Sequence, residues 1–101
     1  MNTRNLLNNN DKFDIPILLI LFNRPLMTEK LVNKLKFIKP SKIYVVADGP
    51  RKNFTDDVLL CNKTEKIIDN NVNWPCEIKK KIRDKNVGLK MMKKLALMPI
   101  D

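Results

Sequence analysis

The sequence predicts an α/β fold in which three strands and three helices alternate, β-α-β-α-β-α, as half of an open doubly wound parallel sheet. Two observations lead to this prediction. First, three short segments have strand character and each ends at a loop signal: residues 15–22, 42–47 and 77–82. Second, each is followed by a segment with helical spacing, and parallel strands need such crossover helices.

The first expected strand, residues 15–22, is a continuous apolar run that is too short and too uniform for an amphipathic helix. Such a run is typical of a strand buried on both faces of a parallel sheet, and Pro16 is tolerated near a strand's start. The third expected strand, residues 77–82, is rich in Lys and has the pattern of an edge strand. We therefore expect the first strand to lie in the middle of the sheet.

The first expected helix begins at Pro25, because the missing N–H of proline is harmless in a first helical turn. It ends before Pro40. Its predicted buried face consists of the apolar residues that recur at helical spacing, which are Met27, Leu31, Leu35 and Ile38.

The second expected helix starts near Thr55, whose hydroxyl is a suitable cap, and ends at Asn70 and Asn71. Its predicted buried face consists of Leu60, Thr64, Ile67 and Ile68. The third expected helix spans residues 90–98 and ends before Pro99. Its predicted buried face consists of Met91, Leu95 and Met98.

Polar residues and glycines follow each of the three expected strands. In open α/β sheets, ligands bind outside the carboxyl ends of the strands, and parallel strands bring these ends to one edge. That edge offers cations, amides and one carboxylate, a mixture that suits a nucleotide. The candidate binding residues from this argument are Asn23, Arg24, Asp48, Gly49, Arg83, Asn86 and Gly88.

The same residues also have simpler interpretations. Asp48 and Gly49, followed by Pro50, are equally the signal of a plain turn. Arg24 can be a solvated loop cation, and Arg83 can pair with the neighbouring acid at the surface. Asn86 and Gly88 can simply shape a tight turn. Neither a Walker motif nor G-x-G-x-x-G is present, and the chain has only two glycines, which excludes a glycine-rich phosphate cradle.

The net charge of the 101-residue chain is +9, and residues 79–94 carry eight bases against one acid. Such a block can attract nucleic acid or an anionic membrane surface. We expect no specific nucleic-acid binding, because no known binding module is recognisable. The longest apolar run has eight residues, whereas a membrane-spanning helix needs about 20. With no signal peptide pattern either, we expect a cytoplasmic protein, at most peripheral at the inner membrane face.

Several catalytic and metal-site classes are excluded by composition. The chain has no His, and its two cysteines, Cys61 and Cys76, do not have the spacing of common zinc sites. A Cys–His pair or a Ser–His–Asp triad is therefore impossible within this chain. We assign no catalytic residue and no metal ligand to it, and the redox state of the cysteines stays open.

Three blocks, IPILLILFNRP, KPSKIYVVADGPR and WPCEIKKKIRDKNVGLK, occur in order and at fitting distances. Together they resemble the start of bacterial glycosyltransferase-like proteins with the Rossmann-like GT-A fold of nucleotide-diphospho-sugar transferases. The resemblance covers about residues 13–90. It implies that the loop from Phe22 to Arg24 lies against the nucleoside and that Asp48 bonds the base. It also implies that Arg83 faces the base or the diphosphate, and that Asn86 and Gly88 shape the loop beneath.

Two departures from this family matter. Leu89 stands between Gly88 and Lys90, where related sequences usually carry a small residue or Cys. The family also has an acidic motif that holds a divalent cation, Mn or Mg, and residues 89–101 contain one acid, Asp101. A diphosphate leaving group needs such positive charge, and an acceptor hydroxyl needs a general base. We therefore expect no cofactor in this chain and no activity of the chain alone.

The expected organisation is a flexible lead-in at 1–14, the nucleotide-binding half of a GT-A domain at 15–90, and a truncated helical tail at 91–101. The expected function is the donor-nucleotide-binding part of a glycosyltransferase, with a nucleotide-sugar as ligand and a downstream polypeptide completing the domain. One alternative is a non-catalytic α/β module that binds a nucleotide or a protein. A second is a basic nucleic-acid-binding domain.

Overall fold

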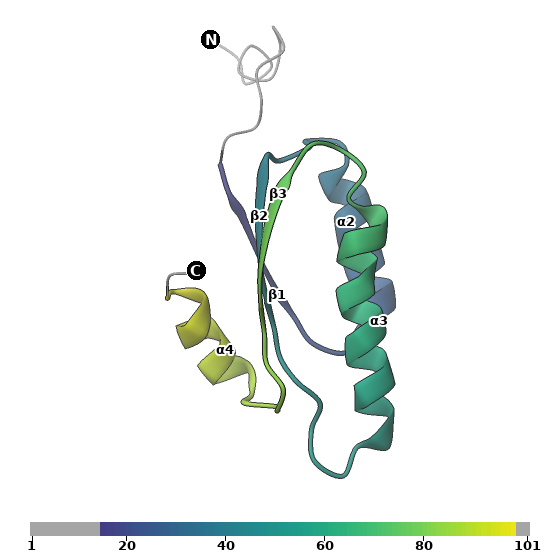
Figure 1. The fold of residues 1–101 in the computed structure, drawn as a ribbon, viewed down its shortest axis with the longest axis vertical. Coiled ribbons are helices and arrows are strands. Elements are labelled where there is room, and N and C mark those ends of the chain that lie inside the picture. Colours follow the sequence, from purple (N-terminus) through teal and green to yellow (C-terminus); the bar gives the residue numbers. More distant parts are fainter. Residues whose placement is uncertain (1–14, 99–101) are drawn as a thin grey trace, which may run out of the picture.

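A computed structural model describes residues 15–98 and confirms the predicted alternation of strands and helices (Figure 1). The predicted lead-in and the end of the predicted tail, from Pro99 on, lie outside the described residues. The elements in chain order are β1 (Ile17–Leu21), α2 (Pro25–Leu35), β2 (Lys42–Ala47), α3 (Thr55–Asn71), β3 (Glu77–Ile82) and α4 (Leu89–Ala96).

The three strands form a parallel sheet in the order β1-β2-β3, as predicted for the α/β class. Their register aligns the carboxyl ends, since Leu21 lies opposite Ala47 and Ala47 lies opposite Ile82. Helices α2 and α3 cover one face of the sheet, and α4 lies against the other face (Figure 1). This gives three layers, with helices on both faces as in the first half of a doubly wound sheet.

The prediction that the first strand lies in the middle of the sheet is wrong for the described residues, because β2 is the strand with two neighbours. Two crossovers whose helices lie on the same face step in the same direction, so the spatial order follows the chain. Leu19 and Leu21 are buried beneath the helices, whereas Leu18 and Ile20 are 42% and 37% exposed. The uniform apolarity of β1 thus reflects one buried face beneath α2 and α3 and a second apolar face, on the α4 side, that is partly exposed.

The main core lies between the sheet and the α2–α3 layer. Trp74, in the middle of the α3–β3 connection, donates its indole N–H to the carbonyl of Pro40 at 2.9 Å. This bond ties the connection before β3 to the one before β2. The buried members of the core are Leu19, Leu21, Val32, Leu35, Ile43, Val45, Ala47, Ile68 and Trp74.

The predicted buried faces of α2 and α4 are partly wrong. In α2, Val32 and Leu35 are buried with Thr28, whereas Met27 and Leu31 are exposed. In α4, Met92 is the buried methionine, and the neighbouring Met91 is exposed. Both helices carry apolar residues on adjacent stripes, so spacing alone does not identify the stripe that faces the sheet.

The second helix is confirmed from Thr55 to Asn71, with Thr64 and Ile68 buried as predicted. Its cap is not Thr55, however, because the N-cap position is Phe54 and no side chain bonds the first turn there. The structure also buries Asp57, which the periodicity did not predict.

Candidate functional site

The candidate binding residues lie around the carboxyl ends of the three strands. The hydrogen bonds between neighbouring strands continue to these ends. The Asp48 N–H donates to the Leu21 carbonyl at 2.9 Å, and the Arg83 N–H donates to the Ala47 carbonyl at 2.9 Å. The loops that follow β1, β2 and β3 therefore leave the sheet side by side. The structure brings the predicted residues to one edge, although it does not place them all in one cavity.

Asp48 is the centre of this edge and is only 5% exposed. One carboxylate oxygen accepts the N–H groups of Gly49 at 2.8 Å and Val87 at 2.9 Å. The other accepts the side-chain amide of Asn86 at 3.0 Å and the N–H of Gly88 at 3.0 Å. A carboxylate has about four acceptor positions, so Asp48 uses its capacity on the chain's own groups. It anchors the loop between β3 and α4 to the end of β2.

Both glycines of the chain are needed for the geometry of this loop. An ideal Cβ at Gly49 would lie 2.6 Å from the Lys85 nitrogen and 2.7 Å from the Arg83 oxygen, so the two loops touch through their backbones. Gly88 has φ 84° and ψ 158°, a conformation that is almost restricted to glycine. The Asn86 side chain also donates to the Gly49 carbonyl at 3.1 Å and closes the contact.

A second cluster, which sequence reasoning missed, ties the loop after β1 to the start of α3. The buried carboxylate of Asp57 accepts a bond from the Asn23 amide at 3.0 Å. It also accepts the N–H, Nε and Nη2 of Arg51 at 3.0, 2.8 and 3.2 Å. The Arg51 guanidinium lies 3.8 Å from the Phe54 ring centre and 5.5 Å from that of Phe22. Asn23 is thus engaged in a structural bond, and no local pattern indicated Arg51.

Hydrogen bonds and the positive charge of Arg51 hold the pKa of Asp57 well below its ordinary value. A lowered folded-state pKa stabilises the fold above the unfolded pKa of about 3.9, and this contribution is lost as the pH falls. We expect Arg51→Ala to be less stable than the wild type at pH 7, with the difference shrinking progressively below about pH 4.

Urea unfolding of both proteins between pH 7 and pH 2.5 measures this difference. Lys52→Ala, which removes an exposed cation from the same loop, is the matched control and should differ little from the wild type throughout. A large Arg51→Ala difference that does not vary with pH would assign the contribution of Arg51 to its packing on Phe54 instead.

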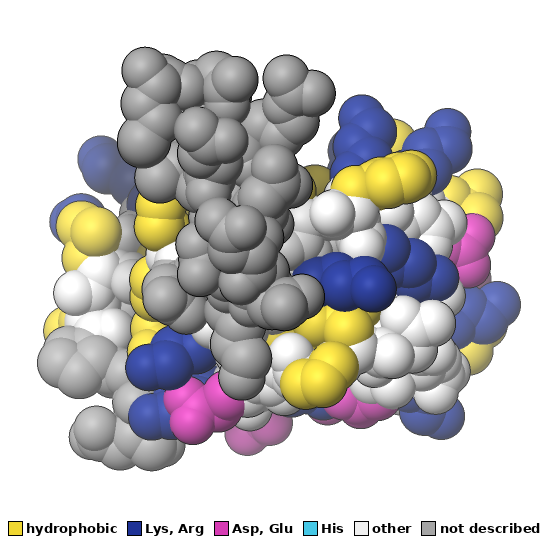
Figure 2. Space-filling view, turned by 90° about the horizontal axis from the view of Figure 1, so that it is seen from above, with side chains coloured by type: hydrophobic (Ala, Val, Ile, Leu, Met, Phe, Trp, Pro, Cys, Tyr) yellow, Lys and Arg dark blue, Asp and Glu magenta, His cyan; other side chains and the backbone are white. Residues whose placement is uncertain are grey.

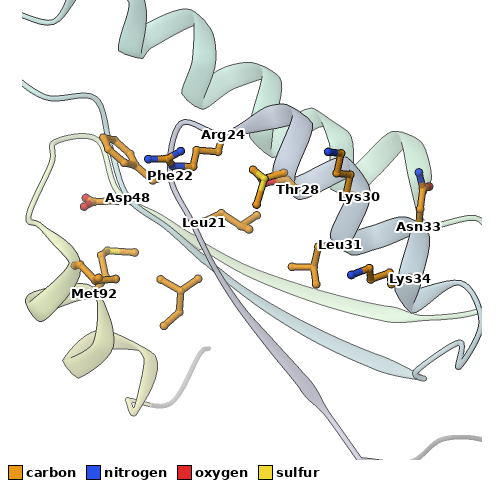
Figure 3. A pocket seen from close by; sticks show the side chains of 13 residues that line it. Leu21, Phe22, Arg24, Thr28, Lys30, Leu31, Asn33, Lys34, Asp48 and Met92 are labelled. Atoms are coloured by element: carbon orange, nitrogen blue, oxygen red, sulfur yellow. The ribbon is translucent and has the colours of Figure 1, made fainter.

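Two hollows flank Asp48. The larger, a cavity of about 760 Å³, runs along the free edge of β1 between α2 and α4 and has Phe22 and Arg24 near Asp48 (Figure 3). The smaller, of about 340 Å³, lies beyond β2 and β3 and is lined by Arg83 with Cys61. Arg24 and Arg83 therefore line different hollows, and Asp48 forms part of the wall of both.

Within residues 15–98, no group of three or more acidic or cysteine side chains is placed to hold a metal ion. Cys61 and Cys76 are free thiols in the structure, and burial raises the pKa of both. No helix of the described part is long and apolar enough to cross a membrane. At the end of the molecule opposite the site, Lys and Arg side chains are scattered among hydrophobic and acidic ones (Figure 2).

Comparison of the chain with protein-family models, curated proteins and solved structures finds no match. A functional proposal therefore has to draw on the geometry of the candidate site and on the sequence resemblance.

Proposed function

We propose that this chain is the donor-nucleotide-binding part of a glycosyltransferase that takes its sugar from a nucleotide-sugar in the cytoplasm. The observation that supports the proposal is the alignment of three parallel strand ends at one edge, with Asp48 at its centre and a guanidinium on either side. In sheets of this kind, the edge outside the carboxyl ends is where nucleotides bind. The resemblance to GT-A proteins in residues 13–90 agrees with this placement.

In the proposal, each candidate residue at this edge has a different role. Arg24 is exposed at the mouth of the larger cavity, where its fork of N–H donors suits a diphosphate. Phe22 supplies an apolar wall beside it for the nucleoside. Asp48 orders the loop that carries Asn86 and Gly88, so a bond from Asp48 to the base has to replace one of the four present bonds. Arg83 borders the smaller hollow on the other side.

The described residues do not fit the divalent cation that a GT-A transferase uses. Asp48 is occupied by four hydrogen bonds, and Asp57 is occupied by Arg51 and Asn23. Neither carboxylate has a second acid beside it in a metal-binding group among residues 15–98. In the proposal, the acidic motif that holds the cation and the acceptor site come from a further polypeptide.

We expect uridine diphosphate, used as a probe, to bind this chain with a Kd no lower than about 1 mM, which corresponds to a binding free energy of about 4 kcal/mol. The binding is weak because the negative charge of the diphosphate is poorly compensated. Titration of ¹⁵N-labelled protein should shift the amide signals of residues 22–24 and of Asp48 and Gly49. Arg24→Ala should weaken these shifts at least several-fold, because it removes the guanidinium at the cavity mouth.

The matched control is Lys63→Ala, which removes an exposed cation on α3, and its titration should follow the wild type. If the shifts instead map to residues 79–94 and disappear with modest salt, the binding is general electrostatics and the donor-site assignment is wrong. The purified chain should also transfer no sugar, and steady transfer by it alone would contradict the proposal that it is only a part of the enzyme.

A further inference from the structure

The free edge of β1 carries backbone groups that the described chain does not pair. Leu21 turns its carbonyl toward β2, where it accepts the Asp48 N–H. The backbone groups of one residue point to the same side of a strand, and the side alternates along it. The N–H and C=O groups of Leu18 and Ile20 therefore point away from β2, and within residues 15–98 no strand lies on that side. This edge is a template for one more strand.

Apolar side chains line both sides of this edge. On the α4 side, Leu18 and Ile20 are exposed along β1 itself. On the α2 side, the exposed Met27 and Leu31 lie on an apolar stripe of α2 that does not face the core. The large cavity joins Ile20, Met27 and Leu31 into one groove along the edge, with Leu31 pointing into it below α2 (Figure 3). Leu18 lies two residues before Ile20 on β1 and is not part of the cavity's lining. An extended segment laid in this groove buries apolar side chains on both of its faces.

The charges around the groove are almost all positive. Arg24, which directly precedes α2, and Lys30 and Lys34, which lie on α2, line the cavity over most of its length (Figure 3). Asp48 is the one acid in the described lining, and its carboxylate is occupied by bonds within the chain. An apolar strand alone would leave these cations without partners, whereas a strand that carries carboxylates pairs with them.

We propose that the free edge of β1, with the groove beside it, is a docking site for an extended apolar segment of another protein that carries acidic side chains. The segment adds to the sheet as a fourth strand through the backbone groups of Leu18 and Ile20. A second copy of this chain is the poorer occupant, because pairing two β1 edges would bring two rows of cations together in a chain of net charge +9. The proposal does not depend on the proposed function: it rests on the β1 edge and on Lys30 and Lys34, and it shares with the proposed nucleotide site the end of the cavity that Arg24 lines.

The test uses the 101-residue protein and three soluble seven-residue peptides of alternating valine and threonine, flanked by glutamates, by lysines or by serines. Binding is followed by chemical shifts and by amide hydrogen exchange. At ten times its Kd, the glutamate peptide should slow exchange at Leu18 and Ile20 about tenfold and leave Leu19 and Leu21, which face β2, unchanged. The lysine peptide should bind about tenfold more weakly, since it loses three weak ion pairs.

A charge reversal separates this site from a general attraction between acidic peptides and a basic protein. The double variant Lys30→Glu/Lys34→Glu changes two cations that line the groove and no buried residue, and it should prefer the lysine peptide to the glutamate peptide. Its matched control, Lys63→Glu/Lys66→Glu, makes the same change on exposed positions of α3 and should keep the preference of the wild type.

Three outcomes would overturn the proposal. One is an equal loss of preference in both double variants, which would mean general electrostatics. Another is peptide binding without any slowing of exchange at Leu18 and Ile20, which would place the peptide elsewhere. The third is a dimer at micromolar concentration, detected by sedimentation, in which these two amides are already protected without peptide, because the occupant would then be a second copy.

Discussion

Replacing Asp48 by alanine is expected to lower the free energy of unfolding by about 3–4 kcal/mol, the largest loss among the changes considered. Its carboxylate accepts four bonds from three backbone N–H groups and one side-chain amide. Bonds to a charged acceptor contribute about 1.5–3 kcal/mol each, and water partly replaces those near the surface. A chain of this length has a thin stability margin, so the variant should be largely unfolded in modest urea.

Urea unfolding followed by circular dichroism measures the loss. Asp84→Ala is the control, because it removes an exposed carboxylate from the same loop and should change stability by no more than about 0.5 kcal/mol. Asp48→Asn should be nearly as unstable as Asp48→Ala, since its NH₂ group would face a donor such as the Gly88 N–H. An Asp48→Ala protein within 1 kcal/mol of the wild type would show that this carboxylate does not hold the β3–α4 loop.

Gly49→Ala should cost about 3 kcal/mol, because the new Cβ would lie 2.6–2.7 Å from backbone atoms of residues 83–85. Backbone atoms cannot move aside as the end of a flexible side chain does, so the β3–α4 loop has to shift and strain its bonds to Asp48. We expect the amides of residues 83–88 to move in the spectrum of the folded fraction and the urea midpoint to fall.

Gly88→Ala is the informative comparison, because its Cβ would meet nothing within 4 Å. Its cost should come from the backbone instead, about 1–3 kcal/mol for holding a non-glycine residue at φ 84° and ψ 158°. It should perturb the start of α4 rather than residues 83–85. If Gly49→Ala is as stable as the wild type, the close contact between the two loops is not a requirement of the fold.

The prediction of the elements worked because their signals are local. An apolar run or a β-branched run followed by a turn signal located β1 and β2, and proline in a first turn located the start of α2. The predicted bounds of β2 and β3 match the structure, and β1 is shorter than predicted at each end. The candidate residues also reached one edge as expected, because parallel strands of similar length necessarily end together.

The bonds within the candidate site were not predictable in the same way. Asp48 bonds groups 38 to 40 residues further along the chain, and Asn23 bonds Asp57 across 34 residues. Nothing in the spacing of such residues distinguishes an acid that binds a ligand from one that anchors a loop. From the sequence, Asp48 was either a donor-site carboxylate or part of a plain turn. In the structure, its carboxylate anchors the β3–α4 loop.

By itself, the sequence determined the α/β class, the order of strands and helices, and the edge where polar loops gather, because each follows from signals within a few neighbouring residues. Only the tertiary structure decided that β1 lies at an edge, that Met27 and Leu31 face a groove, and that Met92 is the buried methionine of α4. These outcomes depend on which surfaces meet. The spacing of apolar residues along a helix identifies an apolar stripe. The arrangement of the neighbouring elements decides whether that stripe is covered.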